Sequence, residues 1–340
     1  MSSNKRNNNM DAIRYYLAFS VVVAHFSACT GSDIPWLTNS ATAVGCFFAL
    51  SGFLVFQSFY KAPNVVYFLR RRALRILPPY FSVVFFAFIC GIIITNLEHI
   101  DYLTSWGTWK YLIANLSFMN FIEPRLPGVF ENNIISVVNG SLWTMKVEWG
   151  LYLSIPIVAW IISRFKTNKI KLSIAIIILS VAYRFSFTLL FEATGNELYF
   201  TWGKQFLGML SYFYSGVLFY LLYDKIMQYR WWILSVLIMI MLLADFIPYY
   251  GIILSPIIES TVVLIACFTG NWGKILDNKN NFSYDIYLFH FPVIQLWVSF
   301  TNNTFPNWLL FACCIISILI ISWASWTFIG KRFVLMRERK

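Results

Sequence analysis

Apolar runs long enough to cross a lipid bilayer recur from one end of this sequence to the other. A transmembrane helix needs about 20 predominantly apolar residues, because the hydrocarbon core offers no water to satisfy its backbone. Ten such runs leave little of the 340 residues for a soluble domain. They predict an all-α, polytopic integral membrane protein with about ten transmembrane helices. The predicted spans are Asp11–Cys29, Ala41–Tyr60, Ile76–Ile94, Trp149–Phe165, Ile170–Phe191, Gln205–Tyr223, Trp231–Ile247, Ile252–Phe268, Tyr284–Phe300 and Trp308–Ile329.

The charged and cysteine residues agree with this class. Only 12% of the residues are charged, whereas a soluble domain carries about 25%. The six cysteines lie in or at the ends of predicted spans, without CxxC spacing or a nearby histidine cluster. We interpret them as small buried hydrophobic residues and predict no metal site.

Lysine and arginine are distributed unevenly between the two sides of the predicted bundle. The loops on the N-terminal side hold most of them, and only Lys110, Arg125, Lys146 and Lys204 fall on the other side. The positive-inside rule therefore places both termini in the cytoplasm, which agrees with an even number of spans. The net charge of +11 mainly reflects this topology. These basic residues suit anionic lipid headgroups, and their spacing in the sequence does not indicate binding of nucleic acid.

The sequence divides into three regions. Residues 1–10 form a polar cytoplasmic leader, which is not expected to be a cleavable signal because it has no small-residue cleavage pattern. Residues 11–331 form the membrane domain, and 332–340 form a basic cytoplasmic tail. Within the membrane domain, 95–148 is the long extracytoplasmic segment, expected to fold as short interfacial helices or to re-enter the bundle. Its aromatic and asparagine side chains suit a sugar acceptor, although an aromatic interface belt has a similar composition.

The first span, MDAIRYYLAFSVVVAH, carries Arg14 and His25 within an otherwise apolar run. At ~100° per residue, both side chains share one helix face and lie about 16 Å apart along the axis. Ionisable groups at bilayer depth are costly unless they face a wet cavity or the bundle interior, so both residues are functional candidates. The structural alternative is open for each: a snorkelling arginine, and a histidine bonded to a backbone carbonyl.

Four arginines precede the third predicted span in the motif FLRRRALRILPPYF. Arg72 and Arg75 share a helical face because they are three residues apart, and Arg71 adds a third guanidinium. Such a dense group suits bidentate binding of phosphates, and a positive-inside anchor is the alternative. Pro78 and Pro79 are expected to break or kink the start of this helix.

Two further motifs bring polar side chains into spans. In VGCFFALSGFLVF, Ser51 and the following glycine lie mid-helix, where small residues allow another backbone to approach closely. The motif NGSLWTMKVEW brings Ser141, Trp143 and Glu148 into the fourth span from outside, and Tyr152 follows on the same helix. Glu148 either favours the dipole at the helix N-terminus or orients and charge-balances a catalytic histidine.

The later spans contain isolated ionisable residues. Arg184, Asp245 and Glu259 are single charges whose partners the sequence leaves open. His290, in FSYDIYLFHFP, is interpreted as structural or interfacial because it lies only a turn or two inside the cytoplasmic face.

The chain resembles the membrane acyltransferase-3 family in five motifs, which follow the family's order along nearly the whole sequence: MDAIRYYLAFSVVVAH, VGCFFALSGFLVF, FLRRRALRILPPYF, NGSLWTMKVEW and FSYDIYLFHFP. It is most similar to the bacterial branch that O-acetylates cell-surface polysaccharides and oligosaccharides. The family's arginine and histidine of helix one fall on Arg14 and His25, and its RxxR falls on Arg72 and Arg75. Relatives often carry an aspartate where this chain has Gly45.

This resemblance implies a bacterial inner-membrane O-acyltransferase. It would move an acetyl or other short acyl group from cytoplasmic acyl-CoA to a hydroxyl of a cell-surface or lipid-linked carbohydrate, with no metal. His25 would act as general base or accept the acyl group itself. Some relatives append an extracytoplasmic SGNH domain, so this chain is expected to finish the reaction itself or to use a separate partner. The implied site residues are His25 and Glu148 for catalysis, Arg14, Arg71, Arg72 and Arg75 for acyl-CoA, and Ser141, Trp143, Ser51 and Tyr152 for the acceptor or for structure.

Two other classes of protein stay open at this point. A transporter or flippase of lipid-linked sugars would also need ten helices and buried charges, although no internal repeat indicates an inverted-repeat transporter. A sensor that kept the fold without activity is the other class, and the intact Arg14, His25 and RxxR argue against it. The acyl group, the acceptor sugar and the oligomeric state are not specified by the sequence.

Overall fold

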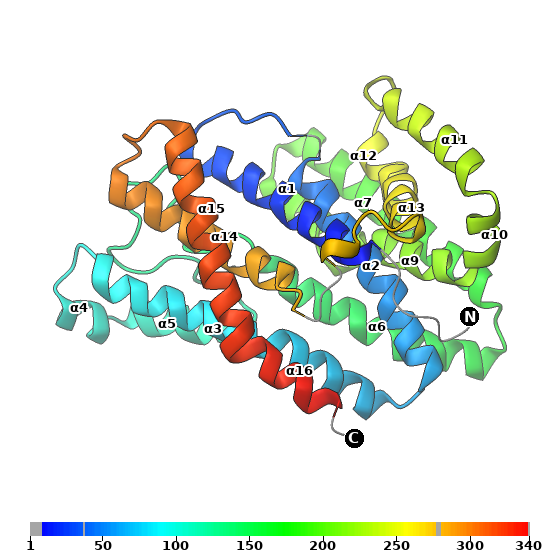
Figure 1. Cartoon of the computed structure of the whole chain (residues 1–340), viewed down its shortest axis with the longest axis horizontal. Coiled ribbons are helices and arrows are strands. Elements are labelled where there is room, and N and C mark those ends of the chain that lie inside the picture. Colours follow the sequence, from blue (N-terminus) through cyan, green and yellow to red (C-terminus); the bar gives the residue numbers. More distant parts are fainter. Residues whose placement is uncertain (1–8, 37, 277–279, 339–340) are drawn as a thin grey trace. The chain divides into compact units, whose positions relative to one another are not determined.

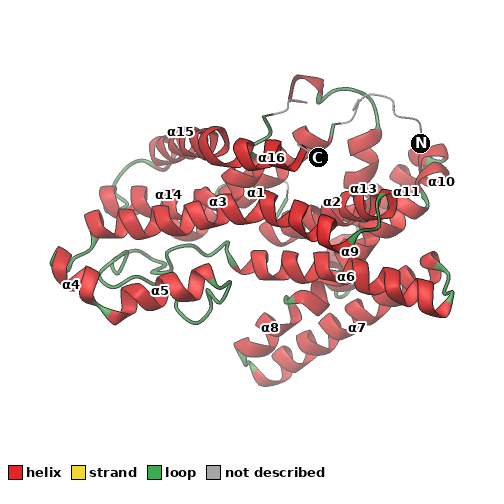
Figure 2. Cartoon of the chain, turned by 90° about the horizontal axis from the view of Figure 1, so that it is seen from below, coloured by secondary structure: helices red, strands yellow, loops and turns green. Residues whose placement is uncertain are grey.

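The computed structural model describes residues 9–36, 38–276 and 280–338, and these ranges contain helices and loops but no strand (Figures 1 and 2). The all-α class is therefore confirmed. Residues 1–8 of the predicted leader and 339–340 of the predicted tail lie outside the described residues. The α-helices are α1 (Met10–Thr30), α2 (Ser40–Lys61), α3 (Val65–Ile94), α4 (His99–Thr104), α5 (Trp106–Leu116), α6 (Trp143–Phe165), α7 (Lys169–Thr194), α8 (Glu197–Gly203), α9 (Phe206–Leu221), α10 (Tyr223–Gln228), α11 (Arg230–Leu242), α12 (Tyr250–Ile253), α13 (Ser255–Phe268), α14 (Ser283–Thr301), α15 (Asn307–Ser325) and α16 (Lys331–Glu338). Three short 3₁₀ or π turns are η1 (Ala244–Phe246), η2 (Lys274–Leu276) and η3 (Trp326–Gly330).

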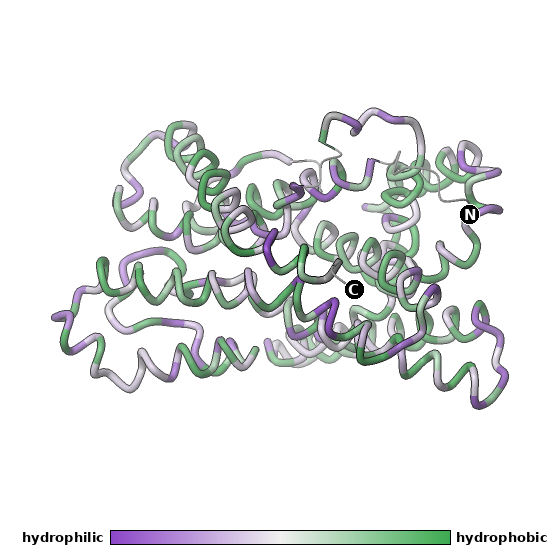
Figure 3. Tube along the Cα trace, turned by 60° about the horizontal axis from the view of Figure 1, so that its bottom comes forward, coloured by the Kyte–Doolittle hydropathy of each residue, from purple (hydrophilic) through white to green (hydrophobic). Residues whose placement is uncertain are grey.

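Six helical segments among the described residues are long and apolar enough to cross a membrane. They are α1, α2, α3, α6, α7 and the stretch Asn307–Met336, which continues from α15 into α16. Hydrophobic residues predominate along the helices, and hydrophilic residues gather at helix ends and loops (Figure 3). The other four predicted spans also form helices, α9, α11, α13 and α14, with 13 to 19 residues each. Because these are shorter than the ~20 residues of a full span, the count of ten stays a prediction.

The prolines of the third predicted span do not break its helix. α3 continues through Pro78 and Pro79 without interruption, so it begins well before the predicted start at Ile76. Membrane helices tolerate proline where neighbouring groups compensate the backbone. The arginines of the RxxR motif therefore lie on the helix itself.

The chain forms two compact units. Unit 1 consists of Met1–Leu17, Ala41–Leu69 and Val147–Asp277, and unit 2 consists of Ala18–Ser40, Arg70–Lys146 and Asn278–Lys340. Since four unit boundaries fall inside helices, α1, α2, α3 and α6 each contribute residues to both units, although α2 contributes only its first residue, Ser40, to unit 2.

In unit 1, α2 and α9 pack closely through glycines. A Cβ atom added to Gly52 would overlap the Phe213 carbonyl, and one added to Gly216 would overlap the Ala49 carbonyl. This confirms the close backbone approach predicted at the SGF motif of the second span. A tyrosine ring of α9 fills the space that a side chain at Gly45 would need.

In unit 2, α14 and α15 form an antiparallel hairpin. Trp297 Nε1 donates to the Ser317 hydroxyl at 3.0 Å, and the Ser325 hydroxyl donates to Asp285 at 2.6 Å, so the end of α15 returns to the start of α14. The C-terminal half of α1 packs on this hairpin, where the Phe26 ring lies 5.0 Å from a phenylalanine ring of α15.

The predicted 95–148 segment begins with the short helices α4 and α5, as expected, and continues as irregular chain. Its residues 133–144 follow α14 in the opposite direction. The Asn133 amide donates to the Gln295 side chain at 3.0 Å, and the Asn139 amide donates to the Leu288 carbonyl at 2.9 Å. The segment thus supplies polar groups along the length of α14.

Candidate active site

His25 of α1 and His290 of α14 are hydrogen bonded within unit 2. Nδ1 of His25 lies 2.7 Å from Nε2 of His290, and the two rings are nearly parallel, with centroids 5.0 Å apart. His290 is fully buried, whereas His25 is only partly buried. The Phe291 ring packs edge-on against His25. This imidazole pair is the centre of the candidate site.

The hydrogen bonds around the pair define which nitrogen of His25 is basic. Nδ1 of His290 lies 3.2 Å from the Ile286 carbonyl, which can only accept, so this nitrogen carries the proton. In a neutral ring, Nε2 of His290 is then the acceptor, and it accepts from Nδ1–H of His25. The lone pair of His25 is therefore on Nε2. His290 fixes the tautomer and ring orientation of its partner, as the third group does in a catalytic triad.

His290 was interpreted as structural or interfacial, and its complete burial and its hydrogen bond to His25 agree with the structural alternative. Its depth was judged from the predicted start of its own span, and helices begin at different heights relative to one another. α14 begins seven positions before His290 and α1 begins fifteen before His25, yet the two side chains meet. The signal in the sequence was a second histidine in a predicted span, and only the packing of α1 on α14 shows that the two belong together.

Ser141 binds the irregular segment to the helix that carries His290. Its hydroxyl, which is 1% exposed, donates to Asn139 Oδ1 at 2.7 Å. The Thr144 hydroxyl is hydrogen bonded to the Tyr287 hydroxyl at 2.9 Å, and the Tyr287 ring contacts His290. Ser141 therefore lies in a buried network next to the histidine pair.

The arginines of α3 differ in burial. Arg72 is 9% exposed, while Arg71 and Arg75 are half-buried. Asp285 of α14, which the sequence analysis did not single out, is 1% exposed and interacts electrostatically with Arg75. The structure thus brings a buried carboxylate to the RxxR motif.

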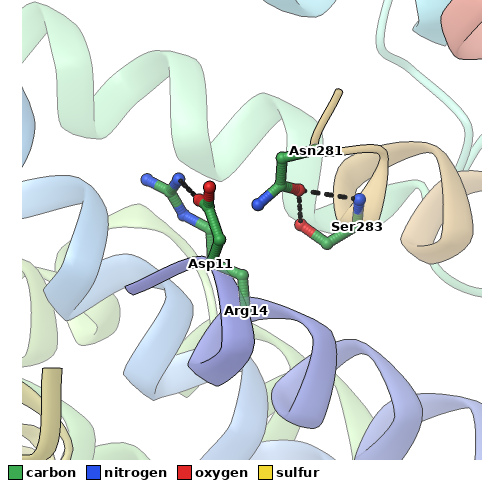
Figure 4. Close-up of polar contacts among 4 residues, drawn as sticks. All are labelled: Asp11, Arg14, Asn281 and Ser283. Atoms are coloured by element: carbon green, nitrogen blue, oxygen red, sulfur yellow. Dashed lines mark hydrogen bonds and ion pairs between the residues drawn. The ribbon is translucent and has the colours of Figure 1, made fainter. Parts of the chain in front are cut away.

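Arg14 lies in the first turns of α1, in unit 1. It forms an ion pair with Asp11 at 3.1 Å, and both side chains are partly exposed (Figure 4). Such a pair contributes little to stability. Figure 4 also shows Asn281 in unit 2, whose Oδ1 accepts from the backbone and hydroxyl of Ser283 and holds the first residue of α14.

Glu148 lies in unit 1, beyond the first turn of α6, because this helix begins at Trp143. The interpretation of Glu148 as a carboxylate at the helix start is therefore wrong. It accepts a hydrogen bond from the hydroxyl of Tyr152, which is buried. Trp143 and Ser51 are both half-buried, on α6 and α2.

Two of the isolated charges gather in unit 1. Glu259 accepts from the Ser255 hydroxyl at 2.8 Å, and Ser255 is hydrogen bonded to the Tyr212 hydroxyl at 2.7 Å. The Arg184 guanidinium lies 5.7 Å from the Tyr212 ring centroid and interacts electrostatically with Glu259. Asp245 is exposed in η1.

No group of three or more His, Cys, Asp or Glu side chains with metal-binding geometry occurs in the described ranges. The six cysteines are free, and four of them are buried. This burial agrees with their interpretation as small hydrophobic residues.

Comparison with known proteins decides the class of this protein. A family model described as an acyltransferase domain matches residues 7–327. The chain belongs to the acyltransferase-3 family. The resemblance in five motifs is thereby confirmed, and the protein is a multi-pass membrane acyltransferase, an enzyme that moves an acyl group from a donor to an acceptor. The match favours this enzyme over the transporter alternative.

Three curated relatives agree with the family. An O-acetyl transferase of Shigella phage Sf6 is 24% identical over 346 residues, covering 97% of this chain and 96% of the relative. Nodulation protein 10 of Rhizobium leguminosarum bv. viciae is 29% identical over 48% of this chain and 47% of its own length. Acyltransferase MdmB of Streptomyces mycarofaciens is 27% identical over 44% of this chain and 38% of its own length. No solved structure matches the chain significantly.

Proposed function

We propose that this acyltransferase moves an acetyl or other short acyl group from cytoplasmic acyl-CoA to a hydroxyl of a cell-surface or lipid-linked carbohydrate. The observation that carries the proposal is the His25–His290 hydrogen bond, which orients a basic imidazole nitrogen inside a membrane acyltransferase. The name of the phage relative, an O-acetyl transferase that aligns along nearly the whole chain, supports acetyl transfer to oxygen.

In the proposed reaction, Nε2 of His25 takes the proton of the acceptor hydroxyl as the hydroxyl oxygen attacks the thioester carbonyl. The new C–O bond forms, the C–S bond breaks, and the proton passes to the departing CoA thiolate. General-base catalysis contributes ~10²–10⁴-fold to such a step. In the alternative two-step reaction, the same nitrogen first accepts the acyl group and then passes it to the sugar. Both routes need the tautomer that His290 supports.

The arginines are proposed to bind the donor. Guanidinium groups bind phosphate oxygens in a bidentate manner, and CoA carries several phosphates. Arg71, Arg72 and Arg75 lie on one helix, α3, and Arg75 interacts electrostatically with Asp285. Arg14 of α1 is proposed as a further donor-binding residue.

A ten-span path with both termini in the cytoplasm, in the bacterial inner membrane, completes the proposal. Consecutive spans in such a path alternate in direction. In unit 1, Asn9 at the start of α1 donates to Thr269 at the end of α13 at 2.9 Å. In unit 2, Asn303 after α14 donates to Thr30 at the end of α1 at 3.0 Å. In such a path, span one begins and span eight ends on the cytoplasmic side, and spans one and nine both end on the outer side. Each of these two hydrogen bonds joins helix ends that the path places on the same side of the membrane, so both bonds support it.

Supplying [¹⁴C]acetyl-CoA to membranes that contain the protein tests this function. The expected result is label in a surface or lipid-linked glycan fraction, released by mild base as an O-ester is. Membranes with His25→Ala serve as the matched control and should incorporate about 10²-fold less label. Equal labelling of glycan with both proteins would exclude His25 as the base. Transport of lipid-linked sugar without any transfer of label would exclude the proposal.

A further inference from the structure

A polar pocket of about 130 Å³ lies in unit 2, where α3 and α14 end. It is bounded by the last residues of these helices and by the irregular segment after α5. The polar lining side chains include Asn96, Glu131, Asn132, Asn133, Asn302 and Asn303. All except Asn133 are exposed, so the pocket is open to water.

The lining suits a neutral ligand that is rich in hydroxyl groups. Each asparagine amide offers both donors and an acceptor, and each sugar hydroxyl needs one of each. Glu131 is the single charged side chain among the described residues that line the pocket, so a phosphate or another anion has no cation to bind there. Phe130 adds an apolar wall, and its positive φ of 58° is a backbone conformation that is costly for a bulky residue.

Some of these amides already have protein partners, and others do not. Asn303 donates to Thr30, and Asn133 donates to the carbonyl of Gln295 at 3.1 Å and to its side chain at 3.0 Å. Among the described residues, no side-chain hydrogen bond is formed by Asn96 or Asn132. Asn303 and Asn133 therefore fix the shape of the pocket, and the side chains of Asn96 and Asn132 can bind a ligand.

The pocket is connected to the histidine pair along α14. Gln295, which is fully buried, lies about one and a half turns beyond His290 on the same helix, and it donates to the carbonyl of Val137 at 2.7 Å. From His290 to Val298 and Ser299, the α14 residues that line the pocket, the helix rises by about 12 to 14 Å, at ~1.5 Å per residue. This is longer than a single sugar ring. A sugar in the pocket is therefore a different unit from one that reacts at His25.

We propose that this pocket is an outer subsite for the carbohydrate acceptor, which holds one sugar unit of a longer glycan while another unit of the same chain is acylated at His25. The proposal rests on the proposed function and deepens it, because it makes the acceptor an oligosaccharide rather than a single sugar. Binding of the distant unit lowers KM for long acceptors and leaves the chemical step unchanged.

The dependence of KM on acceptor length tests the subsite. The acceptors are fragments of one sugar unit and of at least four units, prepared by partial hydrolysis of the cell's surface polysaccharide. In the variant Asn96→Ala/Asn132→Ala we expect KM for the long fragment to rise about tenfold, the scale of one or two lost hydrogen bonds. KM for the single unit, kcat and binding of acetyl-CoA should not change. Asn271→Ala, an exposed asparagine of unit 1, is the matched control.

Two results would overturn the subsite. An unchanged KM for the long fragment would show that the pocket does not bind the acceptor. An equal rise of KM for both fragments would show that it holds the reacting sugar instead. Equilibrium binding of the long fragment to His25→Ala, with and without Asn132→Ala, keeps this test independent of catalysis. If the unmodified protein transfers no acyl group, the proposed function fails, while this binding measurement still decides whether the pocket takes a glycan.

Discussion

Replacing His290 by alanine separates the orientation of the base from the base itself. The variant His290→Ala leaves the His25 imidazole in place but removes the acceptor of its Nδ1–H, which lies 2.7 Å away. Both neutral tautomers of His25 then become populated, and the ring is free to turn. Only the tautomer with a free Nε2 can take the proton of the acceptor hydroxyl.

The size of the effect follows from the lost hydrogen bond. A buried donor left without its partner costs about 1–3 kcal/mol, which corresponds to about 5- to 150-fold at ~1.4 kcal/mol per tenfold. We therefore expect kcat to fall by about 10- to 100-fold, with KM for acetyl-CoA unchanged. His25→Ala, which removes the base, should cost ~10²–10⁴-fold.

The assay measures transfer of the acetyl group from [¹⁴C]acetyl-CoA by purified protein in lipid vesicles. Its acceptor is the glycan fraction that acquires label in the membrane experiment. Because His290 is fully buried, alanine also leaves a cavity, and the thermal unfolding of each variant has to be measured. His290→Gln is the conservative variant, whose side-chain carbonyl offers an acceptor to His25 and should restore most of kcat. His99→Ala, at the exposed start of α4, is the matched histidine control.

The double variant gives the strictest test of this reasoning. If His290 acts only through His25, then His25→Ala/His290→Ala transfers no more slowly than His25→Ala alone, because the residues work as one unit. A further tenfold loss in the double variant would assign His290 an independent role. A folded His290→Ala with unchanged kcat would refute the orienting role. If His25→Ala itself retained transfer, Glu148 would be the next candidate base.

Three other predictions concern topology, donor binding and packing. Reporter fusions within Glu123–Gly128 and at the C-terminal tail should be extracytoplasmic and cytoplasmic respectively, and cytoplasmic activity at both places would contradict the ten-span path. Arg72→Lys should weaken acetyl-CoA binding about tenfold in calorimetric titration, because lysine cannot form a bidentate fork; unchanged binding by both Arg72→Ala and Arg75→Ala would reduce the cluster to a topology anchor. Gly52→Ala should destabilise the protein by about 1–3 kcal/mol in thermal unfolding, since its Cβ would meet backbone, whereas Gly251→Ala, with no atom within 4 Å of the added Cβ, should not. Equal melting of the two glycine variants would contradict the close packing of α2.

Helix position follows from the sequence to a large extent because it depends on local patterns. Apolar length and composition placed a helix at each predicted span, and the small residues of the SGF motif correctly indicated a close backbone contact. The predicted break at Pro78 and Pro79 was wrong, because α3 continues through them, while the alternative of a kink stays a prediction. Proline breaks a helix in water, but its missing hydrogen bond is tolerated where the bundle compensates the backbone.

Sequence alone determined the class of this protein and its family, and it indicated Arg14, His25, Arg72 and Arg75 as candidates, because composition, periodicity and motif order are properties of a linear chain. Only the tertiary structure paired His25 with His290. These residues are 265 positions apart, and no local pattern fixes the relative height of two helices. That height is decided by packing, which brings α1 against α14 at the level where the two imidazoles meet. The same holds for the asparagine pocket, because its residues come from three separate stretches that approach one another only in the folded protein.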